Sequence, residues 1–117
     1  MLDITQSAKK LTSIITSTKN IIEIDTLLRK YNYIFDAMHY SIICCKVSKM
    51  QYDRYYTKKI LDHSIKSWLS INNKKIGRGG RNLANILHSL AKINIKLYVD
   101  ELINEIKYLF QEHLKKI

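Results

Sequence analysis

The chain has 117 residues, a length that fits one domain and buries roughly 65 to 70% of the surface of the unfolded chain. Twenty basic residues against ten acidic ones give a formal net charge of +10, which favours a polyanionic partner such as RNA, DNA or an anionic membrane surface. No stretch approaches the ~18 uninterrupted apolar residues of a membrane span, so we expect no membrane-spanning helix.

Residues that break helices are almost absent. The sequence has no proline, and its three glycines, Gly77, Gly79 and Gly80, fall in one loop. This composition predicts an all-α fold of about five to six helices. Many of the basic residues are lysines that accompany frequent isoleucine and asparagine. An AT-rich genome is therefore an alternative source of part of the charge.

The first 31 residues contain two apolar stripes with the spacing of helices. The first stripe comprises Ile4, Ala8, Leu11, Ile14 and Ile15, and the second comprises Ile24, Leu27, Leu28 and Tyr31. The first 20 residues also resemble an organelle-targeting peptide, because they are rich in lysine, serine and threonine and contain a single acid. We favour a helix here, and the targeting peptide stays an alternative.

Two further stripes predict a second helical hairpin. The helix expected over residues 33–47 places Ile34, Phe35, Met38, Ile42 and Cys45 on one face. The helix expected over residues 51–69 carries Tyr52, Tyr55, Tyr56, Ile60, Leu61, Ile65, Trp68 and Leu69. We expect the three tyrosines in the core or an interface, and Trp68 as an anchor against a neighbouring helix or a partner protein.

The clearest period lies in the last third of the chain. Leu83, Ile86, Leu87, Leu90 and Ala91 form one stripe, and Val99, Leu102, Ile103, Ile106, Phe110 and Leu114 form the next. Only residues 94–96 connect them, so we expect antiparallel neighbouring helices. Asp100 and Glu101 begin the second of these helices, and Lys115 and Lys116 end it, as suits its dipole.

The chain also looks internally repeated. An offset of 48 residues superposes Phe35 on Leu83, Ser41 on Ser89 and Lys59 on Lys107, among other pairs. We therefore expect antiparallel helical hairpins over residues 4–31, 33–70 and 80–116, stacked as a short α-solenoid in one domain. The alternative is an ordinary helical bundle.

Residues 83–92 read LANILHSLAK. This phrase resembles the first helix of octotricopeptide or heptatricopeptide repeats, which occur in the organellar RNA-binding proteins that often end in a RAP domain and are expanded in apicomplexan mitochondria. The resemblance implies a non-catalytic mitochondrial protein that works on ribosomal RNA. In a chain with two or three repeats, it further implies a structural subunit of a mitochondrial ribosome or a related ribonucleoprotein.

The candidate RNA contact is the basic loop of residues 70–80 and the start of the following helix. It supplies Lys74, Lys75, Arg78 and Arg81, and its glycines let the backbone approach phosphate at a helix N-terminus. We add Lys58 and Lys59 from the preceding helix. A solvated connecting loop is the alternative interpretation.

Sequence motifs for catalysis are missing. His39, His63, His88 and His113 stand about one per helix, without the local pairs of a zinc site, so we expect no metal and no cofactor. Adjacent Cys44 and Cys45 cannot readily form a relaxed disulfide, which indicates an intracellular or organellar setting. We expect no enzyme and no small-molecule substrate.

The alternative to RNA association is a protein-only scaffold subunit of an organellar complex, for example a respiratory one.

Overall fold

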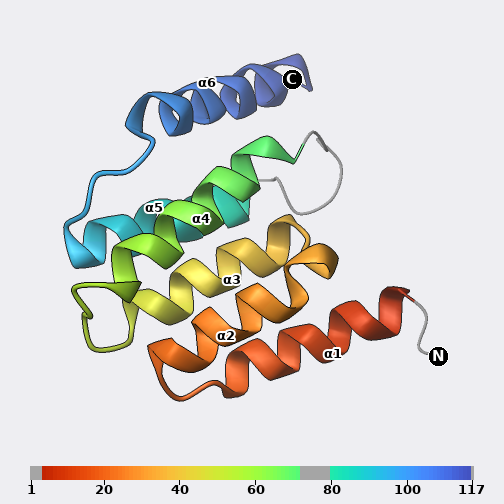
Figure 1. The fold of residues 1–117 in the computed structure, drawn as a ribbon. Helices are drawn as coiled ribbons and strands as arrows, with labels where there is room; N and C mark the ends of the chain where they lie inside the picture. Colours follow the sequence, from red (N-terminus) through yellow and green to blue (C-terminus); the bar gives the residue numbers. More distant parts are fainter. Residues whose placement is uncertain (1–3, 72–79, 117) are drawn as a thin grey trace.

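The computed structural model describes residues 4–71 and 80–116, with the side chains of residues 4–7 left out. This part of the chain is helical and contains no strand, which confirms the all-α prediction. Its elements are α1 Ile4–Ser17, α2 Ile21–Tyr31, the 3-10 turn η1 Asn32–Ile34, α3 Ala37–Ser48, α4 Tyr56–Ser70, α5 Gly80–Ile93 and α6 Val99–Lys115 (Figure 1). None of these helices is long and apolar enough to cross a bilayer.

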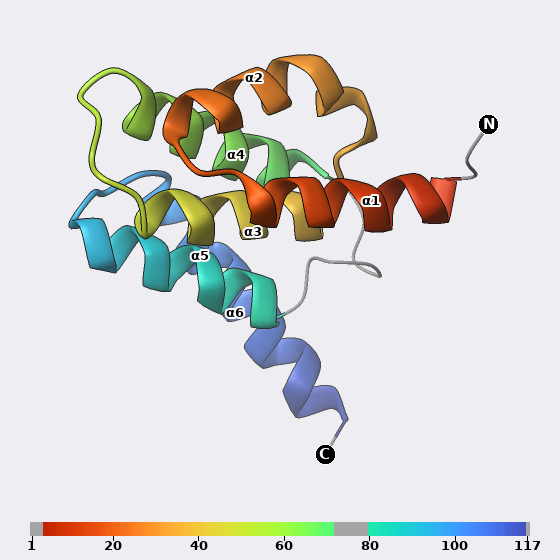
Figure 2. The ribbon, with the colours of Figure 1, turned by 90° about the horizontal axis from the view of Figure 1, so that it is seen from below.

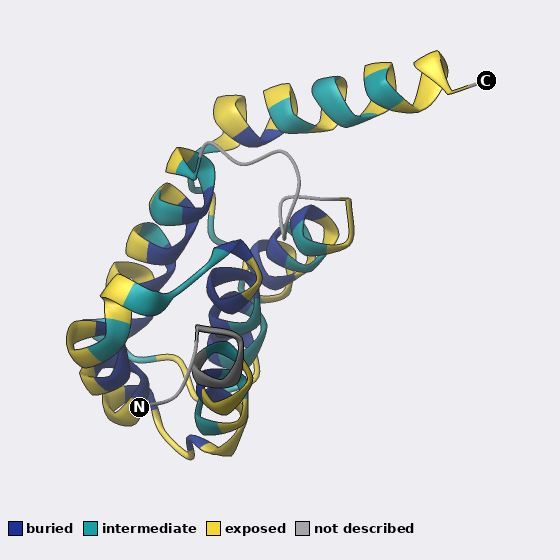
Figure 3. Cartoon of the chain, turned by 90° about the vertical axis from the view of Figure 1, so that its right-hand side faces the viewer, coloured by how far each residue is buried: buried dark blue, intermediate teal, exposed yellow. Residues whose placement is uncertain are grey.

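The helices form two layers around α3. Helix α3 contacts α1 and α5, which lie beside it in one layer, and it also contacts α4 in the second layer, where α4 contacts α2 (Figure 2). Helix α6 contacts α5 and then diverges from the two layers. Burial follows this arrangement, because the inner faces of the layers are buried and most of α6 is not (Figure 3).

The first two helices are those that the stripes predict. Leu11 and Ile15 of α1 are buried, as are Ile24, Leu27 and Leu28 of α2. Asn20 begins α2, because its side chain accepts a hydrogen bond from the backbone N–H of Glu23 and so satisfies a free donor of the first turn.

The predicted face of α3 is wrong. Its buried apolar residues are Ala37, Tyr40, Ile43, Cys44 and Val47. Met38, expected inside, is 40% exposed, and Ile42 and Cys45 are only half-buried. Because α3 packs against helices on three sides, it has no single apolar stripe from which a face could be read.

Three polar contacts fasten α3 to its neighbours in the same layer. His39 is fully buried, and its Nε2 lies 3.0 Å from the carbonyl oxygen of Ala8 in α1. The ammonium of Lys46 donates to the carbonyl oxygen of Thr16 at 2.7 Å. On the other side, the Ser41 hydroxyl donates to Oδ1 of Asn82 in α5 at 2.9 Å.

Helix α4 begins at Tyr56, five residues after the expected start at Gln51. Asp53 sets this boundary: its Oδ1 accepts from the backbone N–H groups of Tyr55 and Tyr56, and its own N–H donates to the Thr57 hydroxyl. Tyr52 and Tyr55 are consequently exposed and do not lie in the core, so for them only the interface expectation stays a prediction, and Tyr56 is half-buried. Trp68 is fully buried, as expected of an anchor within the fold.

Burial supports a different repeat offset from the one predicted. At an offset of 48, exposed Met38 falls on fully buried Ile86. At an offset of 46, four pairs of buried residues match: Ala37 with Leu83, Tyr40 with Ile86, Ile43 with Ser89 and Cys44 with Leu90. The equivalence between α3 and α5 is therefore better described by 46 residues.

The prediction that α6 packs along α5 as an antiparallel neighbour is only partly met. Helix α5 ends in a Schellman motif, in which Asn94 has φ 55° and the N–H of Ile95 donates to the carbonyl oxygen of Leu90. Tyr98 is also left-handed, with φ 52°, and α6 starts directly after it. Of the predicted stripe on α6 only Leu102 is buried, because the helix runs back at an angle that carries it away from α5.

Candidate nucleic-acid interface

Only three of the six predicted contact residues, Lys58, Lys59 and Arg81, belong to the part of the chain that the structure describes. Lys74, Lys75 and Arg78 lie outside the described residues. Arg81 is exposed in the first turn of α5, and Lys58 and Lys59 are exposed in the first turn of α4. Figures 1 and 2 show the starts of these two helices apart from each other. The structure thus separates Arg81 from the two lysines.

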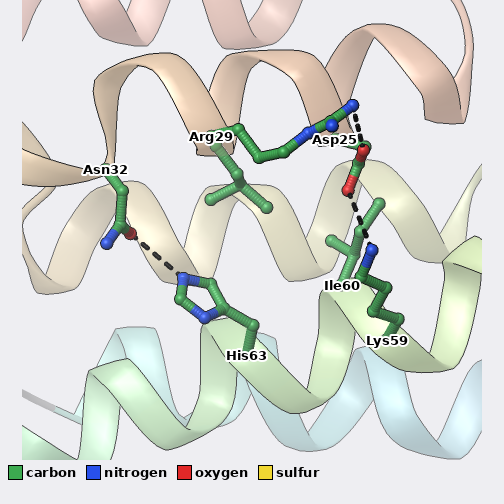
Figure 4. Close-up of a pocket in the computed structure, with 7 residues that line it drawn as sticks. Asp25, Arg29, Asn32, Lys59, Ile60 and His63 are labelled. Atoms are coloured by element: carbon green, nitrogen blue, oxygen red, sulfur yellow. Dashed lines mark hydrogen bonds and ion pairs between the residues drawn. The ribbon is translucent and has the colours of Figure 1, made fainter.

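Lys59 instead lies in a hollow between α2 and α4. The hollow has a volume of about 330 Å³, and its lining residues are Asp25, Leu28, Arg29, Asn32, Lys59, Ile60 and His63 (Figure 4). Its polar lining comes from α2, η1 and α4, and its two apolar lining residues, Leu28 and Ile60, are buried. We call it the α2–α4 hollow.

Asp25 is the buried charge of the α2–α4 hollow. Its Oδ2 lies 2.8 Å from Nη2 of Arg29, one turn later in α2, and its Oδ1 lies 4.0 Å from Nζ of Lys59 in α4. The side chains of both cations are more than half exposed, so each can also face a ligand in solvent. The three charges sum to +1. The carboxylate therefore holds the two cations in place and cancels half of their charge.

A second network closes the other end of the hollow. Oδ1 of Asn32 accepts a hydrogen bond from the Tyr40 hydroxyl at 2.7 Å and lies 3.1 Å from Nε2 of His63. Because this oxygen can only accept, His63 presents an Nε2–H donor. Burial raises the pKa of Tyr40 above its ordinary value of 10.0, so its hydroxyl stays a donor at neutral pH. These bonds link α2, α3 and α4.

Exposed cations and exposed tyrosines occur on and beside both helices of the hollow. The cations are Arg29 and Lys30 of α2 and Lys58, Lys59 and Lys66 of α4. The ammonium of Lys59 lies 5.0 Å from the ring centre of Tyr55, and Tyr33 is 81% exposed beside the end of α2. Lysines can neutralise phosphates, and exposed tyrosines can stack on unpaired bases. We call this set of residues the α2–α4 surface.

Sequence reasoning missed Asp25, Arg29 and Asn32. One signal was available, since Asp25 interrupts the apolar stripe of α2 and Arg29 follows at the spacing of a helical ion pair. Pairing of Asp25 with Lys59, and of Asn32 with His63, depends on how α2 and α4 pack. Sequence spacing carries no information about that packing.

Histidine and cysteine side chains can act as metal ligands and nucleophiles. No group of three His, Cys, Asp or Glu side chains in residues 4–71 and 80–116 could hold a metal ion. Cys44 is fully buried, and burial raises the pKa of its thiol far above the ordinary value, so it is inert as a nucleophile. His39, the one buried histidine of this part of the chain, is hydrogen-bonded through both ring nitrogens.

Comparison with protein-family models, curated proteins and solved structures gave no significant match.

Proposed function

We propose that this protein is a non-catalytic, RNA-associated structural subunit of a mitochondrial ribosome or a related ribonucleoprotein. The observation that carries the proposal is the α2–α4 surface, which combines five exposed cations with the exposed Tyr33 and Tyr55. A net charge of +10 adds long-range attraction to any polyanion. Support for the mitochondrial ribosome comes from the resemblance of residues 83–92 to organellar RNA-binding repeats.

The proposal includes a short stacked array of helical hairpins. It is supported by the contacts of α3 with α1 and α5 in one layer and of α2 with α4 in the other, since equivalent helices of successive hairpins are neighbours in a solenoid. The matching burial of α3 and α5 at an offset of 46 residues also favours it. A stack of this kind presents the outer helices as one continuous surface.

Within the α2–α4 surface, Lys58 is the strongest candidate for a phosphate contact. It is exposed and has no ion pair with any residue in the described part of the chain. Lys59 is adjacent in sequence, but Asp25 and the ring of Tyr55 already engage it. We therefore expect the two neighbouring lysines to contribute unequally to RNA binding.

Salt dependence of RNA binding tests the proposal. The purified full chain is titrated into a fluorescent single-stranded RNA of about 20 nucleotides at several salt concentrations, and the slope of log K against log salt is measured. Lys58→Ala should make the slope shallower by about 0.7, the value of one phosphate contact on a single strand, and Lys59→Ala by clearly less. Lys115→Ala, at the end of α6, is the matched control and should leave the slope unchanged.

Asp25→Asn should have the opposite effect on RNA binding to Lys58→Ala, at the same surface. It removes the carboxylate that restrains Arg29 and Lys59, so the charge of this cluster rises from +1 to +2. RNA affinity should increase and the slope should become steeper. Absence of binding at about 50 mM salt, or a slope that neither Lys58→Ala nor Asp25→Asn changes, would contradict the proposal.

A protein-only scaffold subunit of an organellar complex is the second candidate function. It is favoured by the exposed apolar residues of α6, which suit a protein partner and not a phosphate backbone. A chain that binds no RNA but enters a ribonuclease-resistant complex would support this second function.

A further inference from the structure

Helix α6 exposes an apolar seam along its length. Five large apolar side chains are between 43% and 63% exposed: Val99, Ile103, Ile106, Phe110 and Leu114. Their spacing of three and four residues places them on one face of the helix, as in the seam of a coiled coil. The first three of these residues also line a hollow of about 170 Å³ between α5 and α6, together with Leu87, Leu90 and Leu102 among others. We call these five residues the α6 seam.

Charge along α6 indicates what covers the seam. The first half of the helix carries Asp100, Glu101 and Glu105, for a net charge of −3. The second half carries Lys107, Glu112 and Lys115, and Lys116 follows as the C-cap, for a net charge of +2. A second copy of α6 running in the opposite direction would place each acidic half against a basic half. A parallel copy would instead place like charges together.

We propose that two copies of this chain associate through the α6 seam, with their α6 helices antiparallel about a two-fold axis. In this arrangement Val99 and Ile103 of one copy face the end of the seam that holds Phe110 and Leu114 in the other. The interface is self-complementary and closes on itself, as a two-fold dimer requires. The proposal uses α6 alone and is independent of RNA binding at the α2–α4 surface.

Sedimentation equilibrium of the purified, ribonuclease-treated chain tests the dimer. The expected mass is twice 13.8 kDa at micromolar concentrations. Ile106→Glu with Phe110→Glu should weaken dimerisation by about 100-fold or more, because it places charges at the centre of the interface. Ile22→Glu with Tyr33→Glu is the matched control, since it adds the same two charges at exposed apolar positions of α2 and η1. It should leave the dimer intact.

A charge exchange tests the orientation. Asp100→Lys with Glu101→Lys should weaken the dimer about tenfold, and adding Lys115→Glu with Lys116→Glu in the same chain should restore it. Far-UV circular dichroism of each variant checks that α6 remains helical, because both changes oppose its dipole. A monomeric wild-type chain at about 100 µM, or a chain that joins only a different protein through α6, would overturn the dimer. Failure of the exchange to restore association would overturn the antiparallel arrangement.

Discussion

Asp25 decides how the α2–α4 surface can bind. A carboxylate on the buried side of a helix loses its hydration, and it is tolerated here because Arg29 and Lys59 lie beside it. The same residue holds both cations at a fixed place and lowers their combined charge. The surface is thus better suited to moderate, reversible contact with phosphates than to a tight anion site.

Ser64 offers a test of the core at a single atom. Its hydroxyl oxygen is buried without a hydrogen-bond partner among the described residues. Ser64→Ala removes this unsatisfied group and also improves helix propensity, so the free energy of unfolding should rise by about 1 kcal/mol. Urea denaturation at neutral pH measures the change. Ser89→Ala is the control, because the Ser89 hydroxyl donates to the carbonyl oxygen of Asn85. The free energy of unfolding of this variant should rise by less than that of Ser64→Ala, or should fall.

Asp36 and His39 make stability depend on pH. The hydrogen bond from His39 lowers the pKa of Asp36 below 3.8, against the opposing effect of burial. Burial disfavours the charged His39 ring, but its bonds to Asp36 and to the carbonyl oxygen of Ala8 outweigh this and raise its pKa above 6.5. The lowered pKa of Asp36 stabilises the folded state at pH values above 3.8, and the raised pKa of His39 stabilises it at pH values below 6.5. The two contributions are therefore present together between these values.

Asp36→Asn isolates that contribution, since asparagine keeps the side-chain oxygen that caps α3. The difference in melting temperature between wild type and variant should be largest between about pH 4 and 6.5 and should shrink towards pH 8. Thermal denaturation across this range measures it. A difference that grows steadily up to pH 8 would contradict the assigned pKa directions.

At the scale of elements, helix positions were largely predictable and helix faces were not. Stripes in the sequence located α1, α2 and α5, because each of these helices buries one side. They failed for α3, which is surrounded, and for α6, whose apolar seam stays exposed. Periodicity shows that a helix has an apolar side, but it cannot show whether the same chain covers that side.

The turn after α5 sets the direction of α6. Asn94 occupies the left-handed position of the Schellman motif, which costs a residue with a Cβ about 1 to 2 kcal/mol unless it is asparagine or glycine. Asn94→Ala should lower the free energy of unfolding by about 1 kcal/mol, whereas Asn94→Gly should preserve it. Chemical denaturation measures both. Asn104→Ala, at an exposed position within α6, is the matched control and should be neutral or slightly stabilising.

At the scale of the whole molecule, the sequence predicts a polyanionic class of partner, and this stays a prediction. A net charge of +10 is a property of composition, and it favours a polyanion whatever the fold. The predicted residues Lys58, Lys59 and Arg81 lie in the first turns of two different helices, α4 and α5, whose starts are apart in the structure. The cluster around Asp25 required the packing of α2 on α4, which no local pattern encodes.

Sedimentation of the native protein tests the proposed function most directly. An organelle lysate is run on a sucrose gradient with and without ribonuclease, and the chain is located in each fraction by an antibody. We predict that it migrates with ribosomal particles and leaves those fractions after nuclease treatment. Migration in a membrane or protein complex that resists ribonuclease would contradict RNA association and would favour the scaffold function instead.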